Sequence, residues 1–159
     1  MRFEKVSFEE FSKHFELPEA ALMAYQNIKL PQRATPGSAG YDFFLPMNCC
    51  IHTIPKVIPT GIRVFLDPGC FLMCVPRSGL GFKCGFQLRN TVGVIDHDYI
   101  YSDNEGHILA SVLSDDPVSL HAGDRFMQGI IVKYGTTEDD CPQKEYRNGG
   151  FGSTGGMNA

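Results

Sequence analysis

From residue 28 onward the chain is a series of short apolar runs, each broken by Pro, Gly, Asn or Asp. Turn residues join the runs in TPGSAG (35–40), DPG (67–69), SDNEG (102–106) and HAGD (121–124). Long helical patterns do not alternate with the runs, which argues against a parallel α/β sheet. We therefore expect an all-β sandwich or barrel, with strands at 41–45, 57–66, 70–75, 85–88, 92–95, 107–113 and 126–134.

Residues 1–27 have a different pattern. Ser7 is a candidate helix N-cap with Glu10 three residues later, which is the spacing of a capping box. The segment 17–26, LPEAALMAYQ, is rich in helix-forming residues and has proline near its start. We expect one or two short helices appended to the β domain.

Composition limits the class of protein. The 159 residues suit one domain, and the formal net charge of −4, with scattered basic residues, argues against a nucleic acid polymer as partner. The chain has no membrane-length apolar run and no signal-peptide pattern at its start. The six cysteines contain no CxxC pair, which is typical of free thiols in a reducing compartment. We therefore expect a cytoplasmic protein.

The glycine-rich tail, RNGGFGSTGG (147–156), cannot form a core alone. Taken alone, it favours a mobile C-terminus. The alternative is a phosphate cradle, in which backbone amides and the hydroxyls of Ser153 and Thr154 bind oxygens, Arg147 adds charge and Phe151 stacks on a base. Neither a P-loop nor a Rossmann glycine motif is present in the sequence.

The stretch GVIDHDY (93–99) ends an apolar run with two acids. A partly shielded Asp96 can accept a proton from an attacking water. Asp98 lies on the same side if the backbone stays extended, which invites a metal site, but no histidine pair or third acid nearby in the sequence completes the ligand set. His97 fits a solvent-facing turn, and the other histidines are scattered, so we expect no protein-bound zinc site.

Two further segments allow a phosphate-binding or a purely structural interpretation. PRSGLG (76–81) follows a strongly apolar run, and the proline ends strand pairing there. GDRFMQG (123–129) is a turn that enters a strand, and the amide of Gln128 can donate to a phosphate oxygen.

Together and in order, five segments resemble the signature motifs of the trimeric dUTPases. They are AGYD (39–42), PRSGLGFKCG (76–85), NTVGVIDHDY (90–99), GDRFMQ (123–128) and GGFGSTG (149–155). The resemblance implies an all-β, jelly-roll-like barrel with a short helical extension, assembled as a three-fold homotrimer. It divides the chain into an extension (1–27), a β domain (28–145) and a C-terminal flap (146–159) that closes on a neighbouring subunit's site.

The resemblance also implies an activity, namely Mg²⁺-assisted hydrolysis of dUTP to dUMP and pyrophosphate. Such an activity limits uracil in DNA and supplies dUMP for thymidylate synthesis. Asp96 corresponds to the general base for water attack on the α-phosphorus. By the same resemblance, we expect Tyr99 to lie against the deoxyribose and leave no space for a 2′-hydroxyl. The resemblance also implies that Asp42 acts on Mg²⁺ through a bound water, while the triphosphate supplies the direct ligands.

The remaining site residues implied by the resemblance bind the substrate. The residues expected to hold the phosphates are Arg77, Ser78, Gly79 and Gln128. A hairpin is expected to read uracil through Asn90, Gly93, Val94 and Ile95. The tail is expected to cover the ligand with Arg147, Phe151, Gly152, Ser153 and Thr154.

The chain departs from the family pattern in three places. Arg147 precedes Phe151 by four positions, where the family usually has five. After the third motif the chain runs YIYSDNEGHI, where the family commonly has Tyr-Arg-Gly-Glu. Residues 1–27 lie outside the common core, and we expect them to pack on the outside of the trimer or extend an interface without a direct chemical role.

Two rival functions remain open at this point. A dCTP deaminase shares the fold, but it needs a glutamate on the strand after the third motif, where this chain has HILASVLS. A non-catalytic dUTP-binding regulatory protein is the other alternative. Release of ammonia from dCTP would identify the deaminase. Tight dUTP binding without pyrophosphate release would identify the regulatory protein.

Overall fold

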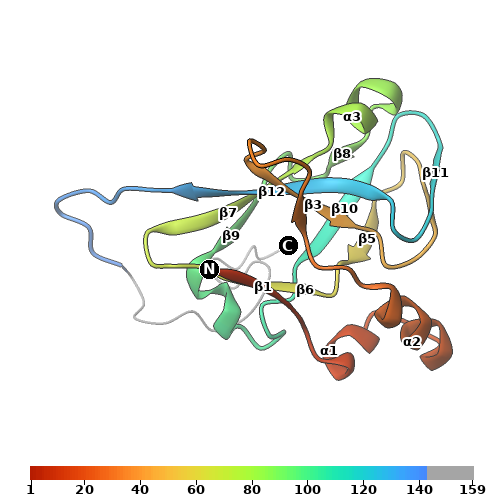
Figure 1. The fold of residues 1–159 in the computed structure, drawn as a ribbon, viewed down its shortest axis with the longest axis horizontal. Helices are drawn as coiled ribbons and strands as arrows, with labels where there is room; N and C mark the ends of the chain where they lie inside the picture. Colours follow the sequence, from red (N-terminus) through yellow and green to blue (C-terminus); the bar gives the residue numbers. More distant parts are fainter. Residues whose placement is uncertain (143–159) are drawn as a thin grey trace, which may run out of the picture.

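The computed structural model describes residues 1–142 (Figure 1). These residues form three α-helices and one 3-10 helix: α1 (Phe8–Ser12), α2 (Pro18–Asn27), α3 (Ser78–Cys84) and η1 (His97–Tyr101). They also form twelve strands: β1 (Arg2–Lys5), β2 (Gln32–Arg33), β3 (Gly40–Phe44), β4 (Cys49–Ile51), β5 (Lys56–Pro59), β6 (Ile62–Phe65), β7 (Cys70–Pro76), β8 (Gln87–Leu88), β9 (Gly93–Asp96), β10 (Leu109–Leu113), β11 (Val118–Leu120) and β12 (Arg125–Lys133).

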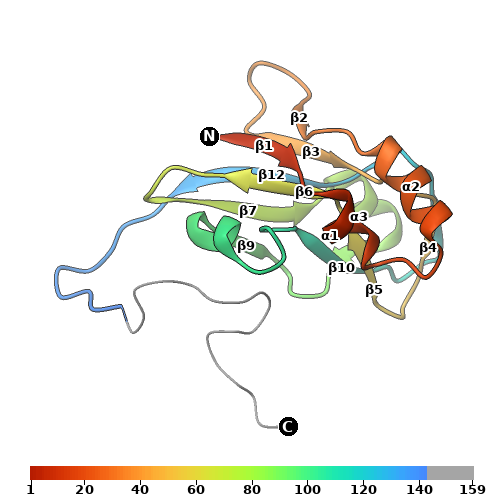
Figure 2. The same ribbon diagram turned by 90° about the horizontal axis from the view of Figure 1, so that it is seen from below.

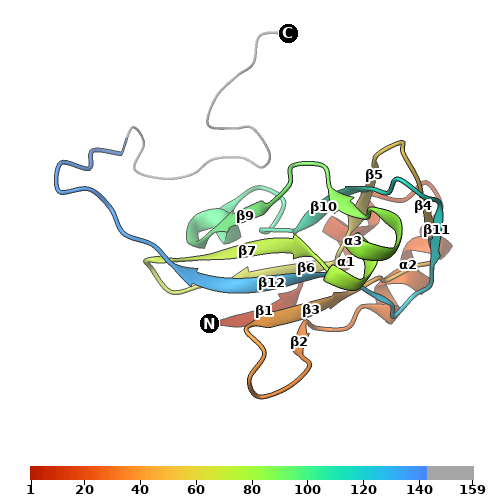
Figure 3. The same ribbon diagram turned by 90° about the horizontal axis from the view of Figure 1, so that it is seen from above.

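The predicted all-β class is confirmed, but the sheets do not close into a single barrel. The largest sheet has the order β2-β3-β12-β7-β9, and Figure 3 shows β9, β7, β12 and β3 in succession. Three smaller sheets pair β1 with β6, β4 with β11, and β10 with both β5 and β8. Within residues 1–142 these pairings leave four separate sheets.

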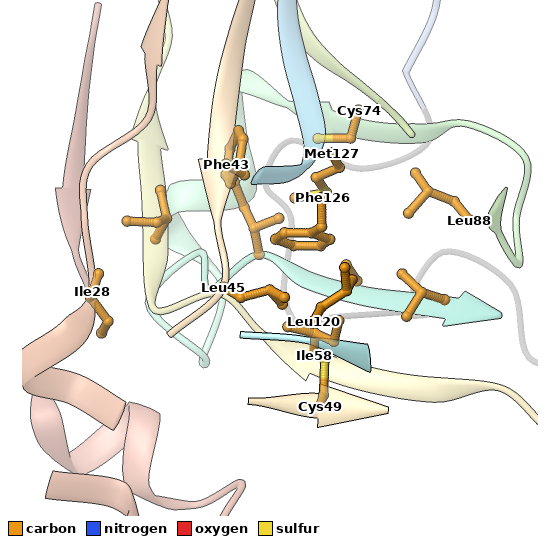
Figure 4. Packing of buried hydrophobic residues seen from close by; sticks show 14 of the residues in the cluster. Ile28, Phe43, Leu45, Cys49, Ile58, Cys74, Leu88, Leu120, Phe126 and Met127 are labelled. Carbon is orange, nitrogen blue, oxygen red and sulfur yellow. The ribbon is translucent and has the colours of Figure 1, made fainter. Parts of the chain in front are cut away.

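The hydrophobic core lies between the sheets. Phe43 from β3 and Phe126 from β12 are fully buried and lie above Leu45 and Ile58 in Figure 4. Alternate residues of β7 are buried as well, as expected for a strand with one face against a core. The core therefore holds β3, β7 and β12 in fixed register, and these three strands carry much of the site described below.

Most strands predicted from the sequence are confirmed, but the strand predicted at 57–66 is two strands. The chain breaks between β5 and β6 at Thr60–Gly61, where Gly61 has φ of +71°. A side chain at this glycine would collide with Ile28, so the backbone conformation and the packing both require glycine.

The strand predicted at 85–88 is also wrong in part. Only Gln87–Leu88 pairs, because helix α3 continues to Cys84 and residues 85–86 connect it to β8. This helix ends at Gly85, which has φ of +66° and donates its N–H to the carbonyls of Leu80 and Gly81. Figure 1 shows α3 on the side of the molecule opposite α1 and α2.

The N-terminal segment contains the two predicted helices and one strand that the sequence did not indicate. Ser7 caps α1 by accepting a hydrogen bond from the Glu10 N–H at 3.1 Å, which confirms the predicted cap. Strand β1 precedes it and pairs with β6. Phe11 and Ala24 belong to the main core cluster, and Figure 2 shows both helices packed at one end of the sheets.

None of the helices within residues 1–142 is both long and apolar enough to cross a membrane. All six cysteines lie in this part of the chain and are free thiols. The division into three segments at residues 28 and 146 stays a prediction.

Candidate functional site

Asp42 is the centre of an ion-pair cluster at one end of the large sheet. Its side chain is buried on β3, and Oδ1 lies 3.3 Å from Nε of Arg77. The other carboxylate oxygen accepts a hydrogen bond from Nη1 of Arg125 at 3.2 Å. One buried carboxylate thus orients two guanidinium groups, which come from the end of β7 and the start of β12.

Gln128 lies beside this cluster because β12 pairs with β3 in antiparallel register. Gln128 is opposite Asp42, and its side chain covers the α-carbon of Gly40. A side chain at Gly40 would occupy the position of the Gln128 amide, so the glycine of AGYD makes room for it. The structure therefore brings together Asp42, Arg77 and Gln128, as the motif resemblance implied.

Helix α3 begins directly after Arg77. The Arg77 carbonyl accepts the N–H groups of Leu80 and Gly81, which leaves Ser78 and Gly79 exposed in the first turn. A pocket of about 340 Å³ lies here, lined by Arg77, Gly79, Leu80, Lys83, Leu120, Asp124 and Arg125. Three of these side chains are cationic and one is anionic, which favours an anionic ligand. Arg125 and Lys83 were missed because neither has an evident partner in the sequence.

The loop between β8 and β9 forms a second part of the candidate site. The predicted hairpin is wrong, because β8 pairs with β10 and β9 pairs with β7, in two different sheets. Asn90 is exposed, and its carbonyl accepts the Val92 N–H at 2.7 Å across Thr91, a residue with φ of +63°. Next to this loop is a small cavity of about 40 Å³, lined by Cys74, Leu88, Asn90, Gly93, Val94, Ile95, Ile108, Leu109, Ala110 and Met127. The structure thus places all four predicted uracil-reading residues around one cavity.

Asp96 ends β9 and is exposed in the single chain. The expected shielding of Asp96 is therefore wrong for one chain, because β9 is the edge strand of its sheet. The expectation that Asp98 shares its side also fails. The backbone turns into η1 at His97, so the strand alternation does not continue to Asp98.

Tyr99 lies on η1 and is buried, with 4% of its surface exposed. Its hydroxyl donates to the carbonyl of His107 at 3.2 Å and accepts from Nδ2 of Asn104 at 2.8 Å. Both partners belong to the loop between η1 and β10. The ring is therefore held in one position by a loop whose sequence departs from the family pattern.

Asp96 and the arginine cluster lie at opposite ends of β7. Asp96 is opposite Phe71, at the start of the strand, while Arg77 follows its end. Six residues at about 3.3 Å each separate the two backbone positions by roughly 20 Å. Figure 3 shows this arrangement, with α3 at one end of β7 and the helix after β9 at the other. This distance is several times the reach of a general base.

Comparison with known proteins agrees with the motif order and the fold. A profile of the dUTPase family matches residues 26–155, which is most of the chain. The chain belongs to the dUTPase family. A deoxyuridine 5′-triphosphate nucleotidohydrolase of Lactococcus lactis is 38% identical over 144 residues, which cover 82% of this chain and 92% of the relative.

Two solved dUTPase structures illustrate the likeness of fold. That of the Streptococcus mutans dUTPase has a TM-score of 0.67 and 31% identity, covering 87% of this chain and 99% of the other. A mutant dUTPase from phage phi11 of S. aureus, described with a structural Mg(II) ion, has a TM-score of 0.63. It is 19% identical and covers 77% of this chain and 95% of the other, so this likeness shows the fold alone.

The predicted dUTPase tail lies outside the described residues. This applies to Arg147, Phe151, Gly152, Ser153 and Thr154. Their roles, and the spacing between Arg147 and Phe151, stay predictions.

Sequence reasoning also missed a side-chain cluster far from the dUTPase motifs. Potential ligand atoms of Glu10, His14 and His107 lie within 4.8 Å of one another. A metal-binding histidine normally donates through its second ring nitrogen. In His107, Nε2 instead accepts the Gly61 N–H at 2.9 Å, so the neutral ring carries its proton on Nδ1, the atom that faces Glu10. We therefore assign the cluster a structural role.

Proposed function

We propose that this dUTPase-family protein hydrolyses dUTP to dUMP and pyrophosphate. The observation that carries the proposal is the Asp42-centred cluster, which aims Arg77 and Arg125 at a pocket of about 340 Å³ beside the first turn of α3. Fixed cationic donors at a helix start are the groups that a triphosphate requires. Gln128 and the backbone of Ser78 and Gly79 complete the phosphate contacts.

The active site is shared between copies of the chain in a homotrimer. The separation of roughly 20 Å along β7 supports this, because Asp96 and Arg77 of one chain are too far apart to act on one phosphate group. In the trimer, Asp96 from one copy meets the arginine cluster of another. The exposure of Asp96 in the single chain then ends when the neighbouring copy covers it.

The chemistry is a direct attack by water. Asp96 accepts a proton while the water oxygen bonds to the α-phosphorus. The bond from the α-phosphorus to the oxygen bridging to the β-phosphate breaks, and its electron pair leaves with pyrophosphate. Arg77 and Arg125 stabilise the negative charge on the phosphate oxygens. Tyr99 lies against the deoxyribose and excludes a 2′-hydroxyl.

The residues around Asp42 fit an indirect role with Mg²⁺. Each carboxylate oxygen of Asp42 already lies beside one arginine, which disfavours direct ligation. Each oxygen still has a lone pair for a water molecule, and Mg²⁺ typically keeps several waters. Asp42 would hold the ion through such a water, with the triphosphate as direct ligand. The bound ion supplies charge neutralisation on the phosphates.

Uracil is read by the segment that contains Asn90, Gly93, Val94 and Ile95, which are among the residues lining the small cavity. The C-terminal flap (146–159) covers the ligand, with Phe151 on the base and Arg147, Gly152, Ser153 and Thr154 toward the phosphates. The activity resides in the cytoplasm, consistent with six free thiols, and involves neither a nucleic acid polymer nor a membrane.

The test is pyrophosphate release with Mg²⁺ from dUTP, UTP, dTTP and dCTP, for the wild type and Asp96→Asn. We expect dUTP-selective turnover that falls by at least 100-fold in the variant, as for loss of a general base. Turnover that survives the substitution would refute the assigned base. Tight dUTP binding without turnover by the wild type would replace hydrolysis with a regulatory function.

A further inference from the structure

The two regions that lie outside the family pattern contact each other. Glu105, in the loop between η1 and β10, accepts the N–H of Ser7 at 2.9 Å and the Ser7 hydroxyl at 2.5 Å. Ser7 is the N-cap of α1, so one carboxylate joins the loop to the N-terminal segment. Figures 1 and 2 both show the loop after η1 beside α1. We call this contact the Ser7–Glu105 clamp.

Glu105 adopts a backbone conformation that is unfavourable for a residue with a side chain. Its φ is +57°, a region that costs a non-glycine residue about 1 kcal/mol or more. A glycine would adopt the same conformation without that cost. The two hydrogen bonds from Ser7 and an ion pair with Arg63 at 3.5 Å offset it. The shape of the loop therefore depends on the N-terminal segment.

The same loop holds Tyr99. Asn104 donates through Nδ2 both to the Tyr99 hydroxyl and to the His107 carbonyl, and that carbonyl also accepts the Tyr99 O–H. Gly106, with φ of +72°, packs so closely on η1 that a β-carbon would lie 3.1 Å from the Tyr99 carbonyl. Tyr99 is therefore fixed at its hydroxyl and along its backbone by the residues on either side of Glu105.

A second contact from α1 supports the end of the loop. The buried His107 ring lies between the Gly61 N–H and the carboxylate of Glu10, whose Oε1 is 3.6 Å from Nδ1. Lys13 neutralises the other Glu10 oxygen at 2.7 Å. Burial, together with the neighbouring His14, lowers the pKa of His107 to about 4, so the ring is neutral at physiological pH and its Nε2 remains an acceptor.

We propose that helix α1 sets the sugar selectivity of the enzyme by holding the 102–107 loop, and through it Tyr99, in place. This inference rests on the proposed function, since it takes Tyr99 as the residue that excludes the 2′-hydroxyl. Ser7, Glu105 and Asn104 are positioning residues. Steric exclusion of the 2′-hydroxyl requires that the Tyr99 ring stay in place. A displacement of a contacting group by about 1 Å is enough to change rates by 100-fold. Loosening the loop would therefore admit a ribose with little loss for deoxyribose.

The experiment measures sugar discrimination by binding and by turnover. Affinities for dUDP and UDP, which lack the γ-phosphate of the substrate, are compared by calorimetry, and kcat and KM are compared for dUTP and UTP. The variants are Ser7→Ala and Glu105→Gly. The first removes the hydroxyl of the clamp, and the second removes the carboxylate while relieving the backbone strain, which preserves folding.

Two matched controls separate positioning from general loosening. Ser7→Thr keeps a capping hydroxyl, and Asp103→Asn removes a charge from an exposed residue of the same loop. We expect the preference for dUDP over UDP to fall about tenfold in Ser7→Ala and Glu105→Gly, the effect of about one net hydrogen bond. The KM for UTP should fall, while kcat for dUTP stays within about twofold of wild type. Both controls should retain the wild-type ratio.

The outcomes also separate this inference from the proposed function. If the wild type hydrolyses dUTP selectively but Ser7→Ala and Glu105→Gly keep the wild-type ratios, α1 has no part in selectivity and the inference is wrong. An equal loss in Asp103→Asn would also overturn it, because the effect would then belong to the loop alone. A wild type that binds dUDP and UDP equally refutes the role of Tyr99 itself.

Discussion

Substitution of Phe11 by alanine tests whether the N-terminal segment is part of the folded core. Phe11 is fully buried on α1, with its ring centroid 5.0 Å from that of Phe15 and 5.6 Å from that of Tyr25. Its Cε2 atom lies next to Gly61, the residue before β6. The ring therefore joins both helices of the segment to the β-sheets.

The expected cost follows from the contacts that are lost. Removing a buried phenylalanine side chain sacrifices about 2–3 kcal/mol of transfer free energy, and the aromatic pairs and the residual cavity raise the total to about 3–5 kcal/mol. For a chain of 159 residues this corresponds to a fall in Tm of about 6–20 °C. A merely appended helix would leave the stability of the β domain within about 0.5 kcal/mol.

The assay is thermal and urea unfolding followed by circular dichroism at fixed protein concentration, because assembly makes Tm concentration-dependent. Phe8→Ala is the matched control, since Phe8 lies on the same helix, 38% exposed, and contacts Tyr25 at its rim. We expect the control to cost about 1 kcal/mol. A Phe11→Ala variant no less stable than the control would refute the reasoning, and residues 1–27 would then be a separable extension.

Three further predictions concern single positions. Asp42→Asn removes the charge that orients Arg77, so kcat/KM for dUTP should fall at least tenfold in steady-state assays. A loss of less than twofold would contradict the role of the Asp42 cluster. Gly61→Ala places a side chain at φ of +71°, so calorimetry should show a loss of about 1–3 kcal/mol, and an unchanged Tm would rule out this strain. Burial raises the pKa of the Cys74 thiol to about 12, above its value in the unfolded chain. The contribution of the protonated thiol to stability is therefore complete below pH 9, and the free energy of unfolding should fall by about 1.4 kcal/mol per pH unit between pH 9 and 12. This decline in stability should disappear in Cys74→Ala. A thiol reagent at pH 8 should modify the exposed Cys50 but not Cys74 in the folded protein, and labelling of Cys74 there would contradict its burial.

Local signals in the sequence predicted much of the fold. The turn segments at 67–69, 102–106 and 121–124 contain glycines with positive φ in the structure, as their turn chemistry requires. The serine cap and the proline at the start of α2 identified both N-terminal helices. These features are decided within a few residues, so the chain reveals them without its tertiary contacts.

Elements that depend on distant partners were not predicted. Strand β1, RFEK, has no alternating apolar pattern and is a strand because it pairs with β6, about sixty residues away in sequence. Helix α3, SGLGFKC, contains two glycines and has poor helix propensity. It forms where Pro76 ends β7 and Gly85 supplies a left-handed C-cap, so its stability comes from its ends.

The motifs proposed a set of site residues, but they did not give the arrangement of these residues in the fold. The motifs proposed Asp42, Arg77 and Asp96 as site residues, yet only the register of β9 on β7 shows that Asp96 and Arg77 lie at opposite ends of one strand. Register depends on which faces are buried, which a single sequence leaves open. The pairing of Asp42 with Arg125 was missed for the same reason, since β3 and β12 are far apart in the chain.

The Ser7–Glu105 clamp changes what a deletion of residues 1–27 can show. The deletion removes Phe11 from the core, uncovers the strained Glu105 and frees the loop that holds Tyr99, so stability and selectivity should fall together. A loss of turnover in such a truncated protein would therefore say nothing about direct chemistry. Ser7→Ala avoids this confusion, because it leaves every core residue of the segment in place. If the clamp acts as inferred, removing this single hydroxyl raises the ratio of UTP to dUTP turnover. The Tm should then fall by only a few degrees, as expected for one lost cap.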